Sequence, residues 1–149
     1  MAHYPLFVSY TWLVQDGPDR LYSLLENYRL RLDPEFDHQM VSVSRDDPVQ
    51  QLPSKKALAL AIEEKMKTCI CLVVLAGVFE EYKRWLDLEL DSAKRLGKPI
   101  VLVEAVASKF TSAKEKRMAK KIVKWDMQEL GEAIVSLSGR TPVSKKKEA

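Results

Sequence analysis

The sequence is poor in the residues that build metal sites. It has two cysteines and two histidines in 149 residues. Cys69 and Cys71 lie two positions apart in an apolar run, and a C-x-C pair with no further cysteine does not supply the ligands of a zinc site. We interpret both as buried free thiols, which suit a reducing compartment, and we expect no metal.

Other absences exclude several common classes of enzyme. With only five glycines, the chain has neither a G-x-x-x-x-G-K-[ST] loop nor a G-x-G-x-x-G turn for phosphates. It has no G-x-S-x-G elbow for a serine hydrolase. A phospho-receiver domain needs an aspartate at the end of its third strand, where this chain has VVLAG, residues 73–77.

Long apolar runs and a strong net charge are also missing. No apolar run reaches 18 residues, and no basic start precedes an apolar core, so we expect no membrane span, no signal peptide and a cytoplasmic location. The net charge is +3, of which three lysines and one glutamate in residues 145–148 supply +2. A nearly neutral body disfavours nucleic acid as a partner. One local basic cluster lacks interleaved aromatic residues and is interpreted as a solvated face, with nucleic acid as the minor alternative: Lys114, Lys116, Arg117, Lys120 and Lys121.

Short apolar runs predict five strands and a parallel sheet. They occupy residues 6–10, 40–44, 69–76, 99–105 and 122–125. The third and fourth are almost entirely aliphatic, as in strands buried on both faces. Helical apolar stripes lie between and after them, over 21–32, 54–66, 81–96 and 126–137, with a loop and a short helix over 106–121. This alternation predicts an α/β three-layer sandwich with five parallel strands, flavodoxin-like in plan. We expect one domain over residues 1–138 and a disordered basic tail over 139–149.

A carboxylate lies where a helix should be apolar. In the predicted helix 81–96, Glu89 falls near the middle of the apolar face, one turn after Trp85. Burying an unpaired carboxylate is costly. Glu89 therefore either reaches the edge of the face or pairs with a lysine or arginine, or it faces a ligand at the carboxyl end of the sheet. There it could hold ribose hydroxyls or stabilise a positive charge at an anomeric carbon.

Other residues at the predicted carboxyl ends of the strands are candidates for the same site. Tyr10, Trp12 and Trp85 could stack a nicotinamide or adenine ring, although Trp85 could equally be core and Trp12 a loop anchor. Arg45, Asp46 and Asp47 follow the second strand, where a turn before Pro48 is favoured over a metal or ribose site.

These motifs resemble a known family. LFVSYTW (6–12) is similar to the first strand of TIR-like domains, which ends in F-[IV]-S-[YH], and RWLDLEL (84–90) is similar to their W-x-x-x-E helix. With GKPIVLV (97–103) and IVKWDMQELGEAI (122–134), the order resembles small stand-alone bacterial TIR proteins such as the ThsB-type sensors of Thoeris antiphage defence. The resemblance covers residues 4–138. Many TIR sequences have serine two residues before the tryptophan, where this chain has Lys83.

The resemblance implies an enzyme that consumes NAD as a substrate and needs no cofactor. A TIR NAD glycohydrolase or ADP-ribosyl cyclase releases nicotinamide and makes an ADP-ribose-type, often cyclic, signal. Glu89 would be the catalytic acid, and substrate would be bordered by Ser9, Tyr10, Thr11, Trp12, Arg45, Asp46, Gly77 and Trp85. The resemblance also implies self-association through TIR surfaces, a downstream effector that responds to the product, and a phage component as trigger. The alternatives are a non-catalytic TIR interaction module and a nucleoside deoxyribosyltransferase-like enzyme.

Overall fold

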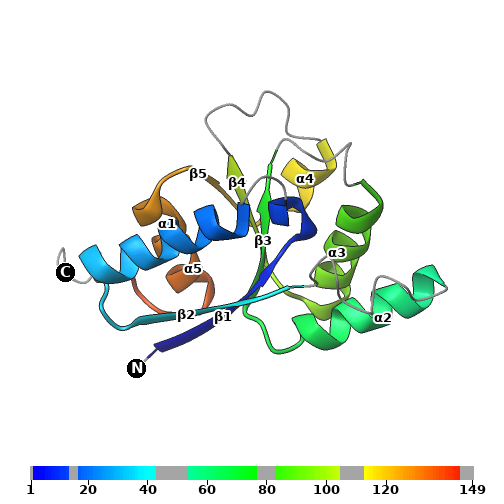
Figure 1. Cartoon of the computed structure of the whole chain (residues 1–149), viewed down its shortest axis with the longest axis horizontal. Coiled ribbons are helices and arrows are strands. Elements are labelled where there is room, and N and C mark those ends of the chain that lie inside the picture. The colour runs from blue at the N-terminus through cyan, green and yellow to red at the C-terminus, as the bar shows by residue number, and fades with distance from the viewer. Residues whose placement is uncertain (1, 14–16, 43–53, 77–82, 105–112, 145–149) are drawn as a thin grey trace.

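The chain folds into alternating strands and helices (Figure 1). The computed structural model describes residues 2–13, 17–42, 54–76, 83–104 and 113–144. In chain order the elements are β1 (Ala2–Val8), the 3-10 helix η1 (Tyr10–Leu13), α1 (Gly17–Arg31), β2 (Phe36–Val41), α2 (Lys55–Met66), β3 (Cys71–Leu75), α3 (Lys83–Leu96), β4 (Ile100–Glu104), α4 (Ala113–Met118), β5 (Lys121–Lys124) and α5 (Met127–Leu137).

The sheet has the predicted flavodoxin-like plan. Its strand order is β2-β1-β3-β4-β5, and every neighbouring pair is parallel. Helices α1 and α5 pack together on one face, and α2 and α3 pack together on the other (Figure 1). The predicted α/β three-layer sandwich is therefore confirmed.

Two strands begin earlier than their apolar runs. The predicted strands 6–10 and 40–44 correspond to β1 and β2, which start at Ala2 and Phe36. The added residues at the start of β1 and β2 pair polar side chains between the two strands. His3 lies 2.7 Å from the Asp37 carboxylate and 3.1 Å from the Gln39 amide oxygen. Because apolar runs alone marked the strands, this polar pairing was missed.

Side chains of the central strands alternate between two buried faces. On β3, Cys71 and Val73 join the core under α1 and α5, whereas Leu72 and Val74 join the core under α2 and α3. Both faces are covered, which explains why the third and fourth runs are aliphatic throughout. Cys69 and Cys71 are buried free thiols, as predicted. Burial raises the pKa of the Cys71 thiol to about 12.

The ends of the helices follow local chemistry. Ser54 caps α2 by accepting a hydrogen bond from the backbone N–H of Ala57. At the other end of the α2/α3 layer, Gly97 ends α3 with φ of 69°, a conformation that favours glycine. None of the described helices is long and apolar enough to cross a membrane.

The chain remains packed beyond the predicted domain end at residue 138. The Arg140 guanidinium lies 5.3 Å from the centre of the Tyr4 ring, and Pro142 is buried. The Ser144 hydroxyl donates a hydrogen bond to Glu132. A buried proline and two side-chain contacts thus place residues 139–144 against the body, whereas the sequence predicts a tail from residue 139 onward. Residues 145–149 lie outside the described part.

Candidate functional site

Glu89 is a buried carboxylate at the carboxyl end of β1. Its side chain projects from α3, and the residue is only 2% exposed. The Ser9 hydroxyl donates to Oε1 over 2.6 Å, and the Tyr10 backbone N–H lies 3.0 Å from Oε2 and 3.2 Å from Oε1. In the described part of the chain, its hydrogen-bond partners are these uncharged donors. Glu89 does not reach the solvent edge, and no lysine or arginine among the described residues pairs with it.

This environment changes the acidity of Glu89. Burial raises the pKa of its carboxyl group to about 7, although the Ser9 hydroxyl and the Tyr10 N–H act in the opposite direction by favouring the ionised form. The group therefore exchanges a proton near neutral pH. It is poised between the acid and the carboxylate.

Hydrogen bonds to β3 hold the turn that contacts Glu89. The Ser9 backbone N–H donates to the Val73 carbonyl over 3.0 Å, and the Leu75 N–H donates to Thr11 Oγ1 over 3.0 Å. The Thr11 N–H in turn donates to Ser9 Oγ over 3.2 Å. The Ser9 hydroxyl thus has one acceptor, Glu89, and one fixed donor, which orients it toward the carboxylate.

Two aromatic rings lie beside the carboxylate. The rings of Tyr10 and Trp85 stack with their centres 4.9 Å apart and their planes at 10°. Both residues are partly buried, and each is linked to Glu89, Tyr10 through its backbone N–H and Trp85 through one turn of α3. The structure therefore brings together Ser9, Tyr10, Trp85 and Glu89.

Trp12 does not belong to this group. It is fully buried, donates from Nε1 to the Val73 carbonyl over 3.1 Å, and packs against Trp125 with ring centres 5.7 Å apart. It lies in the core under α1 and α5, whereas Glu89 is on α3 at the other face. Tyr10 and Trp12 lie two residues apart in the 3-10 helix η1 and point in different directions: Tyr10 stacks on Trp85 of α3, whereas Trp12 packs into the core under α1 and α5. Gly17 allows this arrangement because a Cβ there would meet the Trp12 carbonyl oxygen at 2.0 Å.

The remaining predicted site residues are placed as follows. Thr11 is fully buried and supports the turn. Arg45, Asp46 and Gly77 lie outside the described residues. Lys83, which stands where many TIR sequences have serine, is exposed, and its ammonium group lies 3.4 Å from Asp87.

One functional group could not have been read from residue types. The backbone N–H of Tyr10 binds both carboxylate oxygens of Glu89, and any residue except proline would supply it. Over the described ranges, no cluster of three or more potential metal ligands occurs. The chemistry available is that of a single carboxylate beside a hydroxyl and two flat rings. Such a group can bind sugar hydroxyls and stabilise a developing positive charge.

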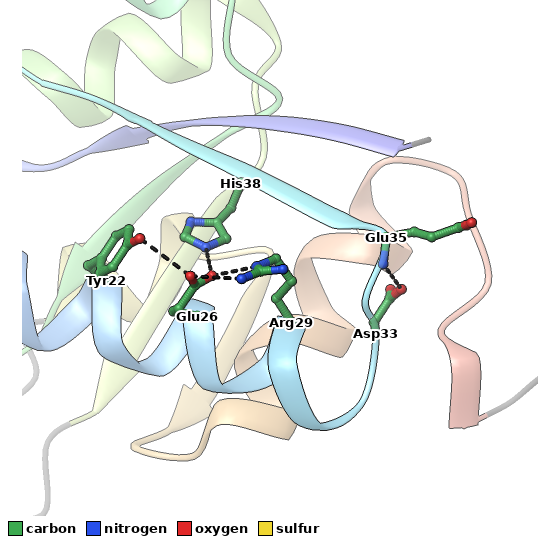
Figure 2. A network of polar contacts seen from close by, with 6 residues as sticks. All are labelled: Tyr22, Glu26, Arg29, Asp33, Glu35 and His38. Carbon is green, nitrogen blue, oxygen red and sulfur yellow. Dashed lines mark hydrogen bonds and ion pairs between the residues drawn. The ribbon is translucent and has the colours of Figure 1, made fainter.

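A second carboxylate cluster differs in kind (Figure 2). Glu26 on α1 accepts hydrogen bonds from Arg29 Nε and Nη2 over 2.6 and 3.0 Å, and His38 Nε2 of β2 lies 3.1 Å away. The Tyr22 hydroxyl points to the same carboxylate. Its hydrogen bonds with Arg29 and then His38 lower the pKa of Glu26 to about 2. This cluster ties α1 to β2 through a carboxylate whose lowered pKa keeps it ionised at neutral pH.

Comparison with known proteins places the chain in a family. The solved structure of the CMP N-glycosidase BcmB of Clostridium botulinum is similar to it, with a TM-score of 0.48 and 13% identity, covering 87% of this chain and 96% of that one. No curated protein matches. The family described as "Thoeris protein ThsB, TIR-like domain" matches residues 7–110, a span that contains Ser9, Tyr10, Trp85 and Glu89. Because that match covers more than half of the chain and includes the whole carboxylate cluster, the chain belongs to the TIR-like domain family of the Thoeris protein ThsB.

Proposed function

We propose that this protein cleaves NAD, releasing nicotinamide and making an ADP-ribose-type signal nucleotide in antiphage defence, with Glu89 as the catalytic carboxylate. The observation that carries the proposal is the environment of Glu89. It is buried at the carboxyl end of the sheet, bound by uncharged donors and bordered by stacked rings. Because no cation of the described part of the chain pairs with Glu89, its charge is available for a ligand.

The proposed chemistry needs only one carboxylate. The bond between the ribose anomeric carbon and the pyridinium nitrogen breaks, and its electron pair leaves with nicotinamide. The leaving group becomes neutral as it departs, so it needs no proton. Ionised Glu89 would stabilise the positive charge left on the ribose and accept a hydrogen bond from a ribose hydroxyl. Water then adds and loses a proton to give ADP-ribose, or an internal nucleophile closes a cyclic isomer.

Substrate binding would exchange partners at Glu89. Because Glu89 is 2% exposed, the turn at Ser9 and Tyr10 must give way so that ribose hydroxyls replace its donors. Separation of the Tyr10 and Trp85 rings would uncover a flat surface on Trp85 for the nicotinamide ring. Such a rearrangement is a natural point for control.

Membership of the ThsB family supports the wider role. In this proposal, a phage component triggers the enzyme in the cytoplasm, subunits self-associate through TIR surfaces, and the product activates a downstream effector.

The test is mass spectrometry of NAD incubated with the protein in lysates of phage-infected and uninfected cells. Wild type, Glu89→Gln and the matched control Glu26→Gln are compared. We expect nicotinamide and an ADP-ribose-type product from wild type and Glu26→Gln, and a loss on the order of 10³-fold in Glu89→Gln.

Full activity of Glu89→Gln would contradict the role of Glu89. Intact NAD in every lysate, with self-association that survives Glu89→Gln, would favour the interaction module. Cleavage of 2′-deoxynucleosides with NAD untouched would favour the deoxyribosyltransferase-like alternative.

A further inference from the structure

A cavity lies at the amino ends of β4 and β5, whereas Glu89 lies at the carboxyl end of the sheet. Its volume is about 630 Å³, and it is bounded by the carboxyl ends of α3 and α4 and by the residues that lead into β4 and β5. Ile100, the first residue of β4, and Lys120, just before β5, both line it. The Glu89 site lies at the other ends of the strands, because its partner Ser9 follows the last residue of β1. Along α3, Gly97 at the cavity comes eight residues after Glu89, or about 12 Å of helix.

The charged residues that line this cavity are all cationic: Lys94, Lys98, Arg117 and Lys120. None of the four forms an ion pair with another described residue; Lys98 donates to the uncharged Lys67 carbonyl over 3.0 Å. Adjacent cations behave differently: Arg95 pairs with Glu63 at 2.6 Å, and Lys114 pairs with Asp87 at 2.7 Å. Within the described ranges, cations without an ion-pair partner are therefore concentrated at the cavity.

Helix ends account for only part of this charge. Lys94 and Arg117 lie in the last turns of α3 and α4, where cations complement the helix dipole. Lys98 and Lys120 lie beyond those helices, in the two connections that enter the sheet. In the predicted solvated basic face, Lys114 is paired with α3, and Lys116, Arg117, Lys120 and Lys121 are exposed, as predicted. Arg117 and Lys120 also line the cavity.

Apolar groups complete the lining. Pro99, Ile100 and Met118 contribute to the wall, and Met118 packs against the core under α2 and α3. The cavity thus combines an apolar surface with several cations. Its volume lies in the range of small-ligand sites, roughly 300–1,000 Å³.

We propose that this basic cavity binds a small organic phosphate, with the phosphate at the lysines and Arg117 and a flat apolar group on Pro99 and Met118. A phosphate carries a charge of about −1.5 to −2 and several acceptor oxygens, which suits several cations better than a single carboxylate does. The site is separate from Glu89, and the inference does not depend on the proposed cleavage of NAD.

The test is a titration with AMP followed by NMR of protein labelled with ¹³C at the methionine methyl groups. The Met118 signal is assigned with Met118→Leu. We expect AMP to shift the Met118 methyl signal to saturation, and adenosine and inorganic phosphate each to bind more weakly.

The double variant Arg117→Gln/Lys120→Gln should weaken AMP binding at least tenfold, since hydrogen bonds to charged groups are lost. The matched control Lys116→Gln/Lys121→Gln removes the same net charge from exposed residues outside the lining and should bind AMP as wild type does. If the first double variant fails to fold, the exposed Lys94→Gln replaces it, with the same tenfold loss expected.

Three results would overturn the proposal. A Met118 signal that does not move with millimolar AMP would do so, including the case in which only other methionines respond, because AMP would then bind elsewhere. An equal loss of AMP affinity in both double variants would mean that AMP responds to the overall positive charge and not to this cavity. Equal affinities for inorganic phosphate and for AMP would mean that the cavity does not recognise the organic part of the ligand.

Discussion

Glu89 and Glu26 are two helical glutamates with opposite surroundings. Glu89 is buried, receives hydrogen bonds from a hydroxyl and a backbone N–H, and has its pKa raised to about 7. Glu26 contacts Arg29 and His38, and its pKa is lowered to about 2. One group is held ready to exchange a proton, whereas the other stays ionised at any physiological pH.

The difference separates a structural carboxylate from a candidate catalytic one. At Glu26, the Arg29 guanidinium and the His38 ring stabilise the charge, and the contact with His38 ties α1 to β2 in the folded state. At Glu89, the folded protein accepts an unfavourable environment for the charge. Such unfavourable placements are characteristic of functional sites, where a ligand or transition state can use the charge.

The largest expected effect concerns stability against pH. The pKa of Glu89 rises from 4.5 in the unfolded chain to about 7 in the folded protein, so the folded state binds the proton more tightly between these values. Its contribution should therefore reduce the free energy of unfolding by about 3 kcal/mol as pH rises from roughly 4.5 to above 7. Glu89→Gln should lack this loss. Its free energy of unfolding, compared with that of wild type, should therefore be higher at pH 8 than at pH 4.5. Urea denaturation at both values measures the difference, and parallel pH curves would refute the assignment.

A smaller effect is expected when the donor to Glu89 is removed. In Ser9→Ala the ionised carboxylate loses one hydrogen bond, which should raise the pKa of Glu89 further and lower NAD cleavage about tenfold at neutral pH. The rising limb of kcat/KM should move to higher pH, because the ionised form is the active one. Ser136→Ala, at an exposed serine of α5, is the control. A uniform drop at all pH values would mean that Ser9 only supports the fold.

The smallest effect is expected at Glu26. Its pKa is depressed, so its stabilising contribution is present above pH 4.5 and is lost as pH falls toward 2. Glu26→Gln should lower Tm slightly at pH 7, and the gap to wild type should narrow below pH 4.5. NAD cleavage should not change. Thermal denaturation measures this difference in Tm. If it widens in acid, Glu26 does not have the lowered pKa that distinguishes it from Glu89.

Local patterns were sufficient for the architecture. The aliphatic runs predicted β3 and β4, and the apolar stripe over 54–66 predicted α2, whose buried residues are Leu58, Ile62 and Met66. These features depend on periodicity within a few residues, which a sequence displays directly. The early start of β2 was missed because Asp37, His38 and Gln39 separate Phe36 from the apolar run.

The site required information of another kind. In the sequence, Trp12 and Tyr10 are equally plausible as rings that stack on a ligand, yet η1 directs them to opposite faces of the sheet. The four cations of the basic cavity lie at the ends of α3 and α4 and just beyond them, and only the fold brings these two segments together.

The sequence by itself determined the strands, the helices and the presence of a carboxylate on the apolar face of α3. Only the tertiary structure decided what that carboxylate experiences. Ser9 is 80 residues away from Glu89 in the chain, and the raised pKa of Glu89 results first from burial by the assembled layers. Secondary structure follows from short-range periodicity, but the acidity of a side chain follows from everything packed around it.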